Sequence, residues 1–275
     1  MNGARLRSIA MHAALALAAA GVLLPVAWTG LAAFKTQIAL LRGDLAFTPT
    51  LANFDELLLS RSSDYFAHFA NSFVIAAAST ALVLVVATLA AYSIVRMRWP
   101  AWVPALVLGF SLVFHMVPPI TLVGPWYVLA RTLGVDDTYS ALVLAHLTLN
   151  LPIALAIMAV FVRDIPIELE EAARLDGCST PQLLRRVIVP LVKPGLAAAG
   201  ILVFVFSWNE FAVALTLTGR HTATVPVAIA RFAQEYEIKH GAMAAGALLS
   251  VVPAVLLLLF AQRHIVKGLV AGAGK

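Results

Sequence analysis

The chain has 275 residues, of which 61% are hydrophobic and only 12% are charged, and its formal net charge is +5. Soluble domains carry about 25% charged residues, so this composition excludes an ordinary soluble protein and indicates an integral membrane protein. In such a chain the positions of Lys and Arg reflect the orientation of the spans and contacts with lipid headgroups. The net positive charge therefore does not indicate nucleic-acid binding, and we expect no nucleic-acid partner.

The apolar residues occur in runs of roughly 20 or more, the length that a helix needs to cross about 30 Å of hydrocarbon. A transmembrane barrel would instead show alternating segments of about 10 residues. The sequence therefore predicts an all-α, polytopic membrane protein. Residues 1–275 are expected to form one transmembrane domain with six spans, at about residues 9–34, 69–95, 101–130, 139–162, 195–218 and 242–261.

The first apolar run follows Arg5 and Arg7 and therefore looks like a secretory signal. It continues through Pro25 and Trp28, beyond the roughly 7 to 15 apolar residues of a signal peptide, which favours an uncleaved first span. In the polar connection after it, residues 48–59 are compatible with a turn into a short amphipathic helix at the membrane surface or with a solvated loop.

The third span is interrupted by Pro118-Pro119 and by Gly124-Pro125. Backbone groups freed by such breaks find partners only inside a helix bundle or in a wet cavity. Met116, beside the first break, and Asn150, next to Pro152 in the fourth span, are therefore candidate residues of a substrate pathway. Each of these residues alone is more often a packing or kink feature.

Glu210 lies about fifteen residues into the fifth span, roughly 23 Å from its start at 1.5 Å per residue. A carboxylate inside the bilayer costs about 2.5 to 3.5 kcal/mol, so it should face the bundle interior, water or a partner subunit. Its neighbours Trp208, Asn209 and Phe211 supply aromatic and amide groups that suit a sugar pathway. An interhelical hydrogen-bond network explains the same residues, and both interpretations stay open.

His115 and His146 are isolated histidines in separate spans, and such residues are typically neutral hydrogen-bond donors between helices. The single cysteine, Cys178, excludes an internal disulfide and a cysteine-rich metal site. We therefore expect no catalytic residue and no metal ligand in this chain.

The placement of Lys and Arg predicts the orientation of the spans. If both termini lie in the cytoplasm, 12 of the 19 basic residues lie inside and the other 7 outside. This excess favours cytoplasmic termini and places the charged loop at residues 163–194 in the cytoplasm.

The sequence of the loop at residues 163–194 predicts two short helices. Pro166 suits a first helical turn, and Glu170 and Arg174 are spaced for an ion pair four residues apart. Gly177 can take the left-handed conformation that ends the first helix. The sequence therefore predicts a helix that begins near Pro166 and ends at Gly177.

The second helix of the loop begins at Ser179, which with Gln182 fits a capping box, or at Thr180, which would place proline at the first helical position. It is expected to stop at Pro190. One apolar face is predicted to pack beneath the membrane helices, and it consists of Leu183, Leu184, Val187 and Ile188.

Ala172 and Ala173 present almost no side chain and are surrounded by carboxylates. Small residues permit close backbone approach, so this surface suits a groove on another protein. An ordinary connecting loop that binds nothing is the competing interpretation.

The pattern Glu171-Ala172-Ala173-x-x-x-Gly177, followed thirteen positions later by Pro190, resembles the EAA loop of the membrane subunits of binding-protein-dependent ABC importers. Val187 and Val189 depart from it conservatively, where Ile and Leu are usual. Further stretches resemble the maltose-type sugar permeases, specifically the shorter six-helix partner of the pair, at residues 91–98, 134–139, 207–211 and 262–272.

This resemblance implies a type I ABC importer permease fold and a coupling helix that docks onto a cytoplasmic ATPase subunit. The residues expected to take part in coupling are Glu170, Glu171, Ala172, Ala173, Asp176 and Gly177. The chain itself is expected to be a transport subunit and not an enzyme. ATP and Mg²⁺ would be bound by the partner ATPase, because Gly274-Lys275 lacks the rest of a phosphate-binding loop.

The resemblance also implies the other members of the assembly. These are a second homologous permease subunit, two cytoplasmic ATPase subunits, a periplasmic or extracellular solute-binding protein, a sugar and the lipid bilayer of a bacterial plasma membrane. The alternative is an ion-coupled secondary transporter with Glu210 as its carrier site, although no inverted repeat is visible in the chain.

Overall fold

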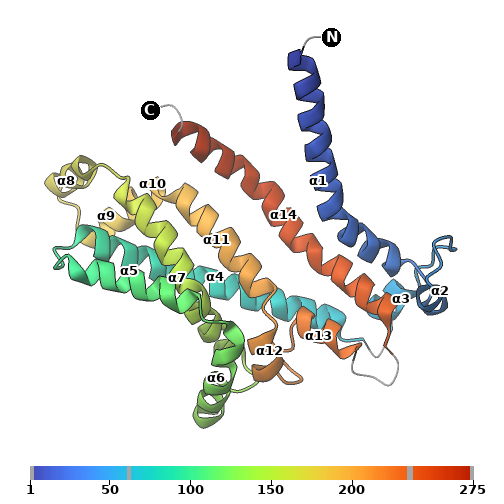
Figure 1. Ribbon diagram of the computed structural model, residues 1–275. Helices are drawn as coiled ribbons and strands as arrows, with labels where there is room; N and C mark the ends of the chain where they lie inside the picture. Colours follow the sequence, from blue (N-terminus) through green and yellow to red (C-terminus); the bar gives the residue numbers. More distant parts are fainter. Residues whose placement is uncertain (1–2, 61–62, 234–237, 273–275) are drawn as a thin grey trace. The chain divides into compact units, whose positions relative to one another are not determined.

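The computed structural model describes residues 3–60, 63–233 and 238–272, and every regular element in these ranges is a helix (Figure 1). The prediction of an all-α chain is confirmed for this part of the protein. The longer helices are α1 (Gly3–Ala33), α4 (Tyr65–Arg96), α5 (Trp102–His115), α6 (Pro119–Leu133), α7 (Tyr139–Arg163), α11 (Lys193–Trp208) and α14 (His240–Gly272). The shorter ones are α2 (Gln37–Arg42), α3 (Ala52–Leu58), α8 (Ile167–Leu175), α9 (Thr180–Leu183), α10 (Val189–Leu191), α12 (Ala212–Leu217) and α13 (Val225–Arg231).

Four helices among the described residues are long and apolar enough to cross a membrane, namely Arg7–Ala33, Tyr65–Arg96, Tyr139–Arg163 and His240–Leu257. Two bent pairs pass the same test as combined units. One pair is α5 with α6, bent by 98°, and the other is Thr180–Leu191 with α11, bent by 77°. Length and composition therefore support four spans, or up to six if each bent pair is one span.

The expected third span is made of two helices. The chain leaves α5 at His115, and α6 begins at Pro119, which occupies its first turn. A proline at this position costs no hydrogen bond, since the first N–H groups of a helix have no intrahelical acceptor. The proline pair thus lets the chain turn sharply without losing backbone hydrogen bonds.

The expected fifth span is also interrupted. Helix α11 ends at Trp208 and α12 begins at Ala212, so Glu210 lies in a break between two helices and not within a continuous one. Its position in the chain, about halfway through an apolar stretch, does not reveal this break. The break is stabilised by hydrogen bonds between the Glu210 carboxylate and the first turn of α12.

Contacts divide the chain into two compact units, residues 1–66 with 228–252 and residues 67–227 with 253–275. In the first unit, α3 shows that the segment at 48–59 includes a helix. Asn53 donates hydrogen bonds from its side chain to the carbonyls of Ala33 and Lys35, and Tyr65 donates to the carbonyl of Gly246. These bonds fasten the end of α1 and the start of α4 within this unit.

In the second unit, α7 packs against both α5 and α11. The core between the helices is built largely from small and medium apolar residues, including Ala87, Ala154 and Met158. A Cβ atom at Gly195 would lie 2.5 Å from the ring of Phe161, so only glycine allows α11 to approach α7 this closely. The candidate functional residues all lie in this unit.

Candidate functional site

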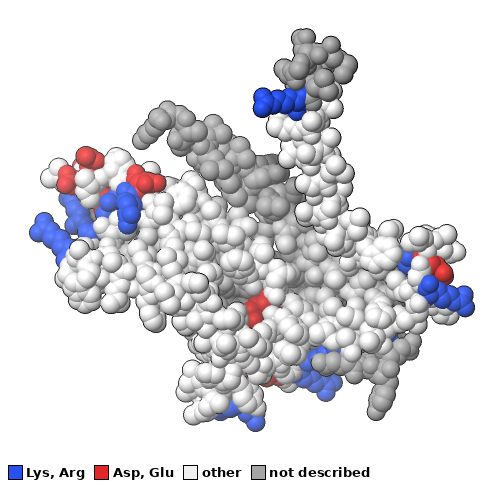
Figure 2. All heavy atoms as spheres, viewed as in Figure 1, with Lys and Arg blue, Asp and Glu red and all other residues white. Residues whose placement is uncertain are grey.

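Helix α8 presents two different faces. Glu170 has only 2% of its surface exposed and Ala173 is also buried, whereas Glu171, Ala172 and Leu175 are exposed. Figure 2 shows acidic and basic side chains gathered over α8 and α9 on a surface that is otherwise mostly uncharged. The six residues expected to take part in coupling are therefore divided, because Glu170 and Ala173 face inward while Glu171, Ala172, Asp176 and Gly177 are exposed.

The end of α8 follows from the glycine after it. Gly177 has φ +82, the left-handed conformation expected from the sequence. This conformation lets the N–H of Cys178 return to the carbonyl of Ala173 and the N–H of Gly177 return to that of Arg174. The exposed face thus ends in a well-defined turn.

The expected ion pair between Glu170 and Arg174 is not the one observed. Glu170 forms its ion pair with Arg96 at the end of α4, and Arg174 lies 3.4 Å from the hydroxyl of Tyr92. Spacing along one helix predicts only its own neighbours, and here a buried partner from a distant part of the chain competes successfully for the carboxylate.

The second helix of the loop begins at Ser179, because Gln182 accepts from the backbone N–H of Ser179 in a capping box. The helix continues beyond α9 through a π-helical segment, Leu184–Ile188, and through α10 to Leu191, so the expected stop at Pro190 is wrong. In a regular helix the ring of Pro190 would clash with the carbonyl four residues earlier, and a wider turn relieves this conflict.

The predicted apolar face of this helix is confirmed. Leu183 and Ile188 are fully buried in the core of the second unit, and Leu184 and Val187 pack against the same core. The helix after α8 is therefore held firmly beneath α4 and α7.

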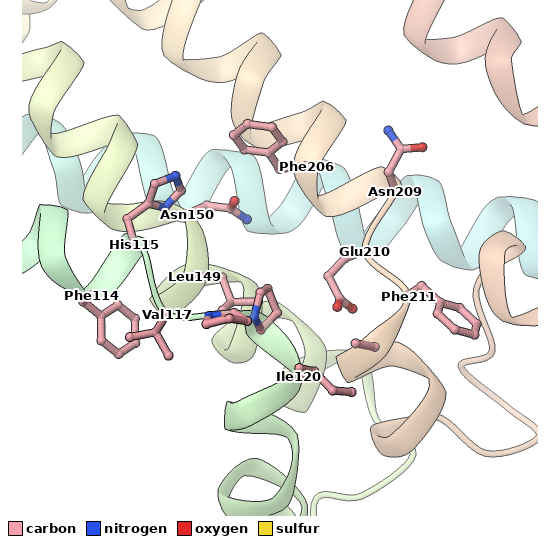
Figure 3. A pocket seen from close by; sticks show the side chains of 13 residues that line it. Phe114, His115, Val117, Ile120, Leu149, Asn150, Phe206, Asn209, Glu210 and Phe211 are labelled. Atoms are coloured by element: carbon pink, nitrogen blue, oxygen red, sulfur yellow. The ribbon is translucent and has the colours of Figure 1, made fainter.

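A cavity of about 600 Å³ lies where the two interrupted segments face each other (Figure 3). It is partly open and mostly apolar. The residues that line it come from the α5–α6 break, from α7 and from the α11–α12 break, and they are Phe114, His115, Val117, Pro118, Pro119, Ile120, Leu149, Asn150, Phe206, Asn209, Glu210, Phe211 and Ala212.

Four of the six predicted pathway residues line this cavity, namely Asn150, Asn209, Glu210 and Phe211. The side chain of Asn150 donates to the hydroxyl of Ser207 at 3.1 Å, which joins α7 to α11. Asn209 is exposed and donates to the carbonyl of Val205 within its own helix.

The two other predicted pathway residues lie elsewhere. Trp208 is buried and stacks on Phe204 with ring centroids 5.9 Å apart, while Phe69 meets its ring edge-on at 5.2 Å. Met116 follows α5 and is 82% exposed. Trp208 is thus a packing residue, and neither side chain lines the cavity. Phe114 and Phe206 do line it, and the sequence offered no signal for them among so many apolar residues.

Glu210 caps the helix that follows it. Its two carboxylate oxygens accept hydrogen bonds from the backbone N–H groups of Val213 and Ala214, both at 2.9 Å. His146 of α7 lies with Nε2 at 3.7 Å from the same carboxylate. The break between α11 and α12 is therefore stabilised because Glu210 satisfies N–H groups that have no intrahelical acceptor.

A second carboxylate, Asp137, organises the loop after α12. It lies in the turn between α6 and α7 with φ +54 and accepts hydrogen bonds from the N–H groups of Gly219, His221 and Thr222 and from the hydroxyl of Thr222. A Cβ atom at Gly219 would lie 2.6 Å from the Asp137 carboxylate, so glycine is needed there. In the sequence, Asp137 stands out only as a member of the family-like stretch at residues 134–139.

Replacing Asp137 with asparagine should destabilise the protein by about 2 kcal/mol, because hydrogen bonds to a charged group contribute more than those to a neutral amide. Burial raises the pKa of Asp137, but the hydrogen bonds from Thr222, Gly219 and His221 outweigh it and lower the pKa from 3.8 to about 2. Because the folded pKa is depressed, this stabilisation is complete above about pH 4 and is lost as the pH falls towards about 2.

The measurement is thermal unfolding of the purified protein, and the difference between variant and wild type should stay constant from about pH 5 to 8. Asp136→Asn is the matched control, because Asp136 makes only an exposed ion pair with Arg131, a kind of contact worth about 0–1 kcal/mol. Equal melting of Asp137→Asn and wild type at neutral pH would contradict the assignment.

Comparison with known proteins identifies the family. Residues 84–270 match the family described as binding-protein-dependent transport system inner membrane component. The chain belongs to this family. It is accordingly a multi-pass membrane subunit of a transport system.

The chain is similar to two curated permease proteins along most of its length. It is 38% identical over 257 residues to the trehalose transport system permease protein SugB of Mycobacterium tuberculosis, covering 92% of each chain. It is 35% identical over 258 residues to the trehalose/maltose transport system permease protein MalG of Thermococcus litoralis, covering 92% of this chain and 91% of that one.

A solved structure shows the same fold. A chain of a bacterial ABC transporter involved in the import of the acidic polysaccharide alginate superimposes with a TM-score of 0.76 at 19% identity, covering 96% of this chain and 98% of that one. The expectation of an ABC importer permease fold is confirmed.

Proposed function

We propose that this protein is the permease subunit of an ATP-driven carbohydrate importer, and that α8 is the coupling helix that docks onto a separate ATPase subunit. The observation that carries the proposal is the exposed outer face of α8 in a member of a transport-permease family. A charged, small-residue face that is exposed in the described part of the chain suits a partner protein.

The docking face consists of Glu171, Ala172 and Leu175, followed by Asp176 and Gly177 in the turn that ends α8. Ala172 permits close approach of a partner backbone. Leu175 is 90% exposed, which is unusual for a leucine in a polar loop and suits an apolar anchor in a cleft. Glu170 and Ala173 are not part of this face, because they are buried.

The charged loop faces the cytoplasm in this proposal, and both termini lie on the same side. The excess of Lys and Arg in the loops assigned to that side supports this orientation. The cavity beside Glu210 then lies between the coupling loop and the opposite face of the membrane.

The working importer contains a second homologous permease subunit, two ATPase subunits and a solute-binding protein. The cavity is partly open, which is compatible with a second permease that contributes to the same pathway. ATP and Mg²⁺ belong to the ATPase subunits, where hydrolysis takes place.

The proposed solute is a carbohydrate. The cavity offers aromatic faces from Phe114, Phe206 and Phe211 and amide groups from Asn150 and Asn209, a combination that suits sugar rings and hydroxyl groups. Its volume of about 600 Å³ lies within the range of about 300–1,000 Å³ for ligand pockets. Relatives named for trehalose and for trehalose/maltose transport support the same class.

An ion-coupled transporter with Glu210 as its carrier site is not supported by the geometry. Both oxygens of the Glu210 carboxylate already accept backbone hydrogen bonds at the start of α12. A proton or cation that neutralised this carboxylate would weaken both of these bonds in every cycle.

The test is uptake by the complete transporter in liposomes, reconstituted with the ATPase subunits, the second permease and the solute-binding protein. Labelled trehalose, maltose and an amino acid serve as candidate solutes. Uptake of a sugar that needs ATP and survives a protonophore is expected. Sugar uptake that needs a proton gradient but no ATP would overturn the proposal, as would transport of the amino acid alone.

A further inference from the structure

A buried polar cluster fastens the inner face of α8 to the ends of two membrane helices. Arg96, the last residue of α4, lies with Nε 2.6 Å from the carboxylate of Glu170. Tyr92 donates from its hydroxyl to the other carboxylate oxygen of Glu170 at 3.2 Å. Nη2 of Arg96 donates to the carbonyl of Val162 at the end of α7 and to that of Ile165 in the turn that follows.

One guanidinium therefore joins three elements, namely α4, α7 and α8. The last carbonyls of a helix have no intrahelical donor, and Arg96 supplies donors to this end of α7. A planar guanidinium has five N–H groups in a rigid fork and can serve several acceptors at once, whereas a lysine ammonium acts as a flexible point charge. The position thus requires arginine for its geometry as well as for its charge.

The polar cluster is shielded from water. The side chains of Glu170 and Arg96 are 2% and 14% exposed. Beside them, Ala173 packs in the same apolar core as Ala91 and Ile165. Charge-assisted hydrogen bonds in such surroundings are stronger and more rigid than those of an exposed pair.

The backbone connections of α8 to its neighbouring helices would by themselves allow α8 to rotate. It is joined to α7 by the short turn at 164–166 and to α9 by the turn at 176–179. A helix that is connected only through two turns rotates about them when a partner displaces it, so the displacement does not reach the membrane helices. The cluster of Arg96, Glu170 and Tyr92 removes this freedom.

We propose that Arg96 and Glu170 are positioning residues that lock α8 to α4 and α7, so that a displacement of α8 moves these two membrane helices. The inference rests on the proposed function of α8 as the coupling helix. Adjacent glutamates then have different tasks, since Glu171 faces the ATPase and Glu170 transmits the movement inward.

The test compares solute transported per ATP hydrolysed, measured on assembled complexes in liposomes. Arg96→Lys keeps the charge but loses the rigid fork, and Glu170→Gln keeps the shape but loses the charge. Both variants should still assemble with the ATPase, because the outer face of α8 is unchanged. The transport ratio of each should fall about fivefold or more.

Arg98→Lys is the matched control, because Arg98 lies two residues further along and is exposed. Its transport ratio should equal that of the wild type. If Glu170→Gln fails to accumulate in the membrane, the paired variant Arg96→Met with Glu170→Leu replaces it, since this pair buries no unpaired charge. The paired variant also lacks the hydrogen bonds between Arg96 and Glu170, so the amount of solute that it transports per ATP hydrolysed should fall as well.

Variants that assemble and keep the wild-type ratio would overturn the inference. The same holds if uptake and ATP hydrolysis fall in parallel, because a merely structural role lowers both without changing their ratio. A wild-type complex without ATP-dependent uptake would overturn the proposed function first, so the two failures are distinguishable.

Discussion

Replacing Ala172 with tryptophan should abolish ATP-dependent uptake, because the indole ring would hold the ATPase away from the docking face of α8. Ala172 is exposed and lies between Glu171 and Leu175 on that face. Loss of close contact at the centre of an interface costs about 2 kcal/mol or more, which corresponds to roughly 30-fold weaker binding. Co-purification of the ATPase with the permease and uptake in liposomes measure the effect.

Two controls separate this effect from misfolding. Ala172→Ser keeps the side chain small and should retain uptake. Ala101→Trp places the same ring on an exposed alanine in the turn before α5, outside α8, and should also retain uptake. If Ala172→Trp binds the ATPase and transports like the wild type, α8 is not the coupling helix.

Replacing Glu210 with alanine should lower uptake severalfold by loosening the helix break that shapes the cavity. The carboxylate caps α12 through the N–H groups of Val213 and Ala214, and loss of such a cap costs about 0.5–2 kcal/mol. The loss should appear in thermal unfolding as well as in transport. Glu210→Asp, which keeps a shorter carboxylate, should lie between alanine and wild type.

The Glu210 variants also test the alternative function. A capping role predicts that residual uptake by Glu210→Ala still requires ATP and still survives a protonophore. Loss of ion coupling with unchanged stability would instead point to a carrier carboxylate. Glu56→Gln serves as the control, because Glu56 is an exposed carboxylate of α3 that pairs with Lys239 at the surface.

Several features of this protein were predictable because their causes are local. Runs of apolar residues predict membrane helices, since the backbone in a bilayer must satisfy its own hydrogen bonds. The end of α8 follows from Gly177, and the buried face of the next helix follows from the spacing of Leu183, Val187 and Ile188. The family resemblance likewise depends on a spaced pattern in one loop.

The candidate pathway residues were predictable only in part. Asn150, Asn209, Glu210 and Phe211 were found because polar or aromatic groups stand out in an apolar span, and they line one cavity. Trp208 stands out equally in the sequence, but it is buried against Phe69 and Phe204. Sequence position does not say which way a side chain points once a helix ends.

The sequence by itself determined the class of the protein, its helical loop and the segment proposed to meet a partner. Only the tertiary structure distinguished Glu170, which is buried, from Glu171, which is exposed, although the two neighbours have the same chemistry. Successive helical residues point about 100° apart, since a turn takes 3.6 residues. Which of the two glutamates is buried depends on Arg96, a residue 74 positions away that holds the Glu170 carboxylate, and on the core that takes up Ala173.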